Sequence, residues 1–273
     1  MVYDLSLNIT DAPRNSSTSA WIQSALSGDD NRTIALRTVL DTIEKARRDP
    51  RIIGIYLDGS NSTENSNSGY AKLKEVRQAL EKFRAAGKTI VAYSSSWGEK
   101  EYYLSSVANT VVLNPLGAME INGLSTSTPF LTGALEKFGV GVQVIRVGKF
   151  KAAVEPLIRK NLSPENRQQT QKLLNDVWGE WRTAVGQNRK ISPNQLQAIA
   201  DSQGYLLAET AQKQGLVDKV DYFDRVLAQL KQLTGEEKEN KTFRQISLSA
   251  YAGVSGKSLG VERNSENKVA IVY

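Results

Sequence analysis

Over the first 113 positions of the chain, segments with the hydrophobic pattern of a strand alternate with segments that have the hydrophobic pattern of a helix. Apolar runs predict strands at residues 2–8, 51–58, 89–94 and 110–113. Apolar residues three and four positions apart predict helices at residues 33–48, 70–86 and 98–108. The run at 51–58 is almost continuously apolar, as in a strand covered on both faces. Because strands and helices alternate with short connections, the pattern predicts an α/β fold with a mainly parallel sheet.

The pattern becomes looser after this point. Residues 116–129 are rich in Gly, Ser and Thr, and the apolar run at 142–147 predicts a fifth, buried strand. Ser163 and Pro164 have the residue types of a helix N-cap followed by Pro at the first helical position, so a long helix is predicted to begin there and to run to about Arg189. The remaining segments are predicted as helices at 131–138, from 192, from 208 and at 222–233, and as strands at 217–220 and 242–251.

The last residues of the sequence read Lys-Val-Ala-Ile-Val-Tyr at 268–273. An apolar, β-branched run of this kind normally opens a buried strand. A buried strand rarely closes a chain, so we expect a second domain to begin here.

Composition excludes several classes of chemistry. The chain of 273 residues has no His and no Cys. It therefore cannot contain a Ser-His-Asp triad, a His-ligated metal, a disulfide or a cysteine nucleophile. Any acid–base chemistry has to use Lys, Asp, Glu, Tyr or Arg.

Charge and hydropathy exclude further classes. The formal net charge is +6, from 35 basic and 29 acidic residues. The basic residues are interleaved with acids and form no run of five, so no nucleic-acid partner is predicted. The amino terminus lacks the basic and apolar regions of a signal peptide, and no apolar run approaches the roughly 20 residues that span a bilayer.

Two common cofactor motifs are missing. The chain contains neither the Gly-x-Gly-x-x-Gly pattern of dinucleotide-binding folds nor a phosphate-binding P-loop, so no cofactor is predicted. The neighbouring acids Glu99 and Glu101, like Asp29 and Asp30, are interpreted as solvated surface residues.

One lysine lies in a setting that favours catalysis. The predicted strand at 142–147 leads into Gly148, and Lys151 then lies among Phe150, Ala152 and other apolar or small residues. Apolar surroundings lower the pKa of a lysine, and a neutral amine can act as a general base. On spacing alone a solvated lysine is the more common case, and Lys149 provides the natural comparison.

These residues resemble a known family. The segment Val-Ile-Arg-Val-Gly-Lys-Phe-Lys-Ala-Ala-Val-Glu-Pro at 144–156, followed by Ser-Pro-Glu-Asn-Arg at 163–167, is similar to the amino-terminal half of signal peptide peptidase A, also called protease IV. The resemblance extends over residues 3–273. Shorter matching stretches lie at 53–58, 80–88, 102–105 and 215–218.

The resemblance implies a ClpP/crotonase-like fold with two similar halves and a helical extension. Residues 1–260 would form the amino-terminal half, with the extension at about 157–234, and residues 261–273 would be a linker and the first strand of the carboxy-terminal half. It also implies a serine endopeptidase with a Ser-Lys dyad that degrades cleaved signal peptides through an acyl-enzyme. Lys151 would be the general base, and the carboxy-terminal half would supply the serine.

The family also suggests partners and a location. By resemblance the protein forms a homotetramer and is held at a membrane by an anchor absent from this chain, with its catalytic part outside the cytoplasm. The chain by itself is expected to be soluble. It is also expected to be inactive, because the nucleophile half is missing.

The sequence departs from the family pattern where the second half carries its nucleophile. Glu99 occupies the position of the serine, and residues 61–64 lack the glycines that would form an oxyanion hole. The serines near these positions are expected to cap strands and helices; they are Ser94, Ser95, Ser96, Ser105 and Ser106. Two alternatives stay open: an assembly module in which Lys151 forms a structural ion pair, for instance with Glu155, and an acyl-CoA-type binding domain.

Overall fold

A computed structural model describes residues 1–11, 33–60, 68–236 and 239–255. The predicted linker and strand at 261–273 lie outside these residues, as do most of the loops predicted at 11–31 and 59–67. The division of the protein into halves at residue 260 therefore stays a prediction.

The centre of the fold is a mainly parallel sheet with the order β1-β4-β5-β6-β7, as the sequence predicts. The first four strands pair in parallel, β7 is antiparallel to the end of β6, and β8 is parallel to an earlier part of β6. The strands are β1 (Val2–Asp4), β4 (Gly54–Asp58), β5 (Thr89–Trp97), β6 (Thr110–Glu120), β7 (Tyr205–Leu207) and β8 (Lys219–Val220).

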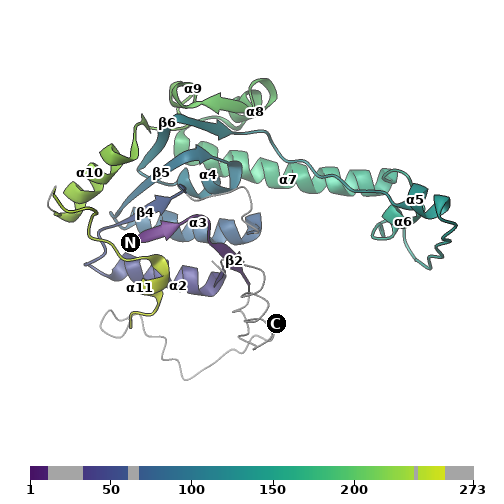
Figure 1. Cartoon of the computed structure of the whole chain (residues 1–273), viewed down its shortest axis with the longest axis horizontal. Coiled ribbons are helices and arrows are strands. Elements are labelled where there is room, and N and C mark those ends of the chain that lie inside the picture. The colour runs from purple at the N-terminus through teal and green to yellow at the C-terminus, as the bar shows by residue number, and fades with distance from the viewer. Residues whose placement is uncertain (12–32, 61–67, 237–238, 256–273) are drawn as a thin grey trace.

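Helices cover both faces of this sheet (Figure 1). In β4, Ile55 and Leu57 belong to the larger apolar core, which also includes residues of α2 (Leu36–Arg48), α3 (Tyr70–Ala85) and α4 (Glu99–Ser105). Tyr56, between them, packs instead in a smaller cluster with residues of α10 (Phe223–Thr234). This alternation follows from the two-residue period of a strand. It confirms the α/β class and the strand covered on both faces.

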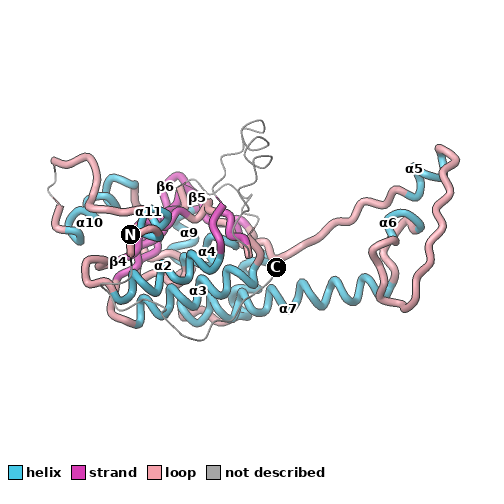
Figure 2. The backbone as a smooth tube through the Cα atoms, turned by 90° about the horizontal axis from the view of Figure 1, so that it is seen from below, coloured by secondary structure: helices cyan, strands magenta, loops and turns pink. Residues whose placement is uncertain are grey.

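A long projection leaves the body of the molecule after β6 (Figures 1 and 2). The chain runs outward from Asn122, carries α5 (Thr132–Lys137) and α6 (Glu155–Ile158) near its far end, and returns along α7 (Pro164–Arg189). The buried residues of α7 begin only at Trp178. We call residues 122–177 the arm. It corresponds in part to the helical extension that the resemblance implies.

Two predicted strands are wrong. Residues 142–147 form no strand, because they lie on the arm with no partner strand, and Ile145 and Val147 are 102% and 87% exposed. The segment at 242–251 instead ends in the helix α11 (Leu248–Ala252), whose N-cap Ser247 accepts a hydrogen bond from the backbone of Ala250 at 3.2 Å. The pattern of apolar residues alone does not distinguish a buried strand from an exposed segment such as 142–147, or from a short helix such as α11.

Several boundaries also differ from the prediction. The strand predicted at 2–8 is broken after Asp4, whose carboxylate accepts hydrogen bonds from the backbone and hydroxyl of Ser6. The chain then forms β2 (Asn8–Thr10), which pairs with β3 (Thr33–Ala35) in a separate two-stranded sheet. Such aspartate turns interrupt a strand without changing its apolar pattern.

The carboxy-terminal part of the chain confirms the remaining helix starts. Ser163 and Ser192 are the N-caps of α7 and of α8 (Pro193–Ser202), and each accepts a hydrogen bond from a backbone N–H three residues later at 3.1 Å. The short α9 (Ala208–Lys213) follows β7. Among the described helices, none combines the length and the apolar character needed to cross a membrane.

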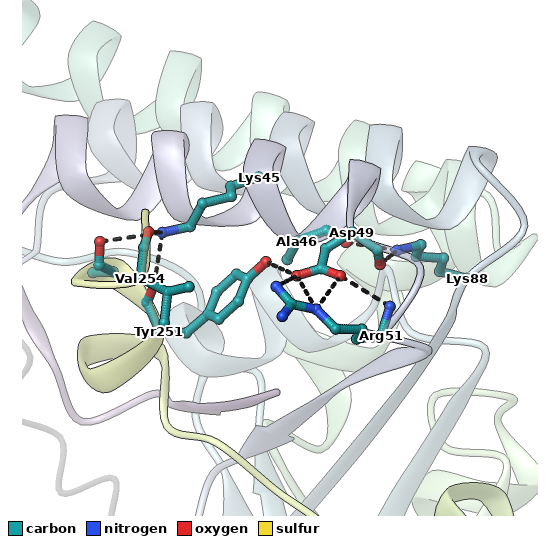
Figure 3. Close-up of polar contacts among 8 residues, drawn as sticks. Lys45, Ala46, Asp49, Arg51, Lys88, Tyr251 and Val254 are labelled. Atoms are coloured by element: carbon teal, nitrogen blue, oxygen red, sulfur yellow. Dashed lines mark hydrogen bonds and ion pairs between the residues drawn. The ribbon is translucent and has the colours of Figure 1, made fainter. Parts of the chain in front are cut away.

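A polar cluster fastens α11 to α2 (Figure 3). The ammonium of Lys45 donates hydrogen bonds to the carbonyls of Tyr251 and Val254 at 2.7 and 2.6 Å. The hydroxyl of Tyr251 donates to the buried carboxylate of Asp49 at 2.7 Å, and Arg51 donates to the same carboxylate at 2.7 Å. Segments separated by about 200 positions in the sequence are therefore joined by charge-assisted hydrogen bonds.

Candidate active site

Lys151 lies on the arm, in the loop that leads into α6. Lys151 is exposed, and Phe150 beside it is 57% exposed, which agrees with the solvated lysine that spacing alone favours and not with an amine surrounded by apolar neighbours. Within the described part of the chain, the Lys151 amine has no hydrogen-bond or ion-pair partner. It is therefore accessible to a group from outside this chain segment.

The backbone beside Lys151 is held by a buried carboxylate. Glu155 is fully buried, and its Oε2 accepts hydrogen bonds from the backbone N–H of Ser163 and the side-chain amide of Asn166, both at 3.0 Å. The Glu155 backbone N–H donates to the carbonyl of Ala152 at 2.9 Å. These bonds join the lysine loop to the first turn of α7.

An arginine completes this loop. Arg146 donates a hydrogen bond to the backbone carbonyl of Lys151 at 3.0 Å, and its guanidinium lies 3.9 Å from the second oxygen of Glu155. That oxygen accepts no hydrogen bond. The ion pair between Lys151 and Glu155, proposed for the assembly-module alternative, is not among the ion pairs of the described residues. Arg146 takes that place.

Acid is expected to loosen this loop. Burial opposes ionisation of Glu155, but the hydrogen bonds from Ser163 and Asn166 prevail and hold the pKa of its carboxyl below the ordinary 4.5. A lowered pKa stabilises the folded loop above pH 4.5, and the stabilisation is lost as pH falls through the folded-state value. We predict that protection of the Ser163 amide from hydrogen exchange drops in this acid range in the native protein. In Glu155→Gln the protection should not vary with pH, and an equal drop in both proteins would contradict the assignment.

A shallow cavity of about 420 Å³ opens beside Lys151. Its walls come from the lysine loop and from α7, and they are more apolar than polar. The lining residues are Arg146, Phe150, Lys151, Ala152, Ala153, Val154, Asn166, Gln169, Thr170 and Leu173. The cavity could accept an apolar side chain next to the amine.

A second cavity, of about 650 Å³, lies between the sheet and α10 and contains no residue of the arm. It is lined by apolar residues such as Ile53 and Leu230. The charged side chains at its edge, Arg51 and Arg244, are already paired with carboxylates. Among the described residues, no group of acids is arranged to hold a metal ion.

The serines considered as nucleophiles are not brought to Lys151 in the described structure. Ser94 is buried and donates to the carbonyl of Gly59 at 2.9 Å, and Ser106 is buried and accepts from Arg77 at 2.8 Å. Ser105 is also buried, and Ser95 and Ser96 lie near the end of β5. These positions favour structural roles.

The interpretation of Glu99 and Glu101 as solvated acids is wrong. Glu101 is only 7% exposed. The carboxylate of Glu99 accepts hydrogen bonds from the backbone N–H groups of Asn122 and Gly123 at 2.6 and 2.8 Å. Burial raises the pKa of Glu99, while these two donors oppose the rise. No local sequence signal marks Glu99, because Asn122 and Gly123 lie more than 20 positions away in the sequence.

Comparison with known proteins places these features in a family. The family model described as Peptidase family S49 matches residues 82–237, which include the arm, Glu99 and Lys151. The chain is 32% identical to "Serine protease SPPA, chloroplastic" of Arabidopsis thaliana over 89% of its own length and 35% of that protein. It is 31% identical to "Protease 4" of Salmonella typhi over 88% of its length and 38% of that protein.

A third relative has a similar identity to the chain. The chain is 33% identical to "Protease 4" of Haemophilus influenzae over 69% of its own length and 31% of that protein. The chain thus spans about a third of the length of these curated relatives. The mainly parallel sheet with surrounding helices agrees with the ClpP/crotonase-like fold that the resemblance implies, and the match covers more than half of the chain. The chain therefore belongs to peptidase family S49, as a member of the signal peptide peptidase A group.

Proposed function

We propose that this chain is the base-donating, amino-terminal part of a Ser-Lys dyad endopeptidase. The observation that carries the proposal is the state of Lys151, exposed on a projecting arm with no described partner for its amine. A lysine held by a fixed backbone but with a free amine is suited to meet a group supplied by another segment. The absence of His leaves an amine as the natural base.

The chemistry follows from the dyad. The neutral amine of Lys151 takes the proton of a serine hydroxyl while the serine oxygen attacks the peptide carbonyl. The protonated amine then gives this proton to the leaving amino group, and an acyl-enzyme remains. Water releases the acyl group with Lys151 again acting as base. The serine would come from the carboxy-terminal half of the protein.

The substrate class is proposed from the family resemblance and from the surface of the arm. Cleaved signal peptides are apolar, and the cavity beside Lys151 is mostly apolar. Association with a membrane outside the cytoplasm and assembly into a homotetramer are proposed on the resemblance alone. The assembly-module alternative has lost its suggested partner for Lys151, since Arg146 faces Glu155.

A serine-directed acylating or phosphonylating reagent tests the proposal on the full-length protein. The native protein should cleave an apolar leader-like peptide and lose that activity as one serine per chain becomes labelled. Mass mapping should place the label outside residues 1–255. A label on Ser94, Ser95, Ser96, Ser105 or Ser106 would contradict the two-part dyad, and the absence of cleavage would contradict peptidase activity.

A further inference from the structure

The outward segment of the arm and the part of α7 that follows the arm both contact one residue, Glu99. This residue is the first of α4 and follows β5 directly. On the outward side, its Oε1 accepts hydrogen bonds from the backbone N–H groups of Asn122 and Gly123 at 2.6 and 2.8 Å. On the returning side, its backbone carbonyl accepts a hydrogen bond from Nε1 of Trp181 in α7 at 2.9 Å.

Apart from these bonds, the outward segment contacts the body through Leu124, which packs against the apolar core. Residues 125–129 are exposed, and the buried residues of α7 begin at Trp178. Farther out, Leu131 donates to the carbonyl of Pro156 at 2.7 Å, and Thr132 donates to that of Arg159 at 2.6 Å. Those bonds hold the two sides of the arm to each other. They do not set the direction of the arm relative to the sheet.

The surroundings of Glu99 are built for a fixed geometry. Trp178 and Trp181 are stacked, with ring centroids 4.8 Å apart and an angle of 17° between the planes. Gly123 has a φ of +81°, which residues with a side chain rarely adopt, and this sets the direction in which the chain leaves its contact with the Glu99 carboxylate. A Cβ at this position would lie 4.0 Å from the ring of Trp178.

We propose that Glu99 is a positioning residue that fixes the direction of the arm and, through it, the place of Lys151. The first part concerns only the arm. The second part rests on the proposed function, since it assumes that Lys151 is the base. Glu99 occupies the position at which the carboxy-terminal half of the family carries its nucleophilic serine. This half would then use the same position for a hydrogen-bond acceptor that anchors the arm.

Two readouts on the full-length protein separate these parts. The first is amide hydrogen exchange at Asn122 and Gly123, combined with the distance between spin labels at Lys137→Cys on the arm and Lys82→Cys on α3. Both label positions are exposed, and this chain has no other cysteine. The second is hydrolysis of an apolar peptide. The variants are Glu99→Ala, Glu99→Gln, which keeps an acceptor oxygen, and Gly123→Ala, which disturbs the same contact from the other side.

In Glu99→Ala and Gly123→Ala we expect the two amides to exchange about 10- to 100-fold faster and the distance distribution to broaden. We expect kcat to fall about 100-fold with little change in KM, because misplacement of a catalytic group by about 1 Å has this effect. Glu99→Gln should resemble the native protein. So should Glu180→Ala, which removes a surface ion pair between α7 and Lys74.

An unchanged distance distribution in both Glu99→Ala and Gly123→Ala would overturn the proposal, whatever the activity. A broadened distribution with unchanged kcat would overturn the link to Lys151 and leave the role of Glu99 in the arm. If the native protein has no peptidase activity, the proposed function fails, and the distance measurement still decides the role in the arm.

Discussion

Replacement of Lys151 by Ala in the full-length protein is expected to lower kcat/KM for peptide hydrolysis about 1,000-fold. The reason is that Lys151 is the general base in the proposed dyad, and a positioned general base contributes roughly 10²- to 10⁴-fold to rate. Lys149→Ala is the matched control, since Lys149 lies two residues earlier in the same exposed loop. Its activity should stay within about twofold of the native value.

A third variant distinguishes a base from a structural cation. Lys151→Arg keeps the positive charge but cannot become neutral in the accessible pH range. We expect it to be as inactive as Lys151→Ala. Recovery of activity in Lys151→Arg, or equal losses in the Lys149 and Lys151 variants, would favour the assembly-module alternative. Unchanged circular dichroism of each variant would show that the fold persists.

Replacement of Asp49 by Ala is expected to destabilise the body of the protein by about 2–3 kcal/mol. Hydrogen bonds from Arg51 hold the pKa of the fully buried Asp49 carboxyl far below its ordinary value, so the carboxylate is charged at every working pH. Its removal leaves the buried hydroxyl of Tyr251 without an acceptor and breaks the charge-assisted bonds to Arg51. The loss is limited because Arg51 is 65% exposed and water can solvate its charge.

Thermal unfolding measures this effect. A loss of about 2–3 kcal/mol lowers Tm by about 4–12 °C in a domain of this size. Glu44→Ala is the control on the same helix, since Glu44 forms partly exposed ion pairs with Arg47 and Arg48. Such surface pairs contribute about 0–1 kcal/mol. Hydrogen exchange should also quicken in residues 248–254 of the Asp49 variant alone. Equal shifts in Tm for both variants would contradict a special role for the buried cluster.

The sheet could be predicted because its strands bury apolar residues within the same chain. Residues 51–58, 89–94 and 110–113 all contain observed strand residues, and the flanking helices follow their apolar stripes. The segment 142–147 has an equally apolar pattern but lies uncovered on the arm. The pattern of apolar residues indicates that a segment is suited to burial. It does not indicate which part of the protein covers that segment.

The candidate site was predictable only in part. The family resemblance identified Lys151, but not the contacts that hold its loop. Glu155 accepts hydrogen bonds from Ser163 and Asn166, which are close to it in the sequence. Glu99 accepts hydrogen bonds from Asn122 and Gly123, which approach it only once α4 and β6 have formed. Contacts of the second kind depend on tertiary structure, and a single sequence contains no periodic signal for them.

The exposed half of α7 is held at the end that lies in the body of the molecule, so a small change of direction there becomes a larger displacement at the other end. From Pro164 to Val177 the helix has no buried residue, and at a rise of 1.5 Å per residue this part is about 21 Å long. A tilt of one degree at the fixed end therefore moves the free end by about 0.4 Å. Catalytic groups need placement within about 0.5 Å, so bending of a degree or two would already exhaust that tolerance. The contacts of α7 with the body therefore have to hold its direction to within about a degree or two if Lys151 is to stay in place.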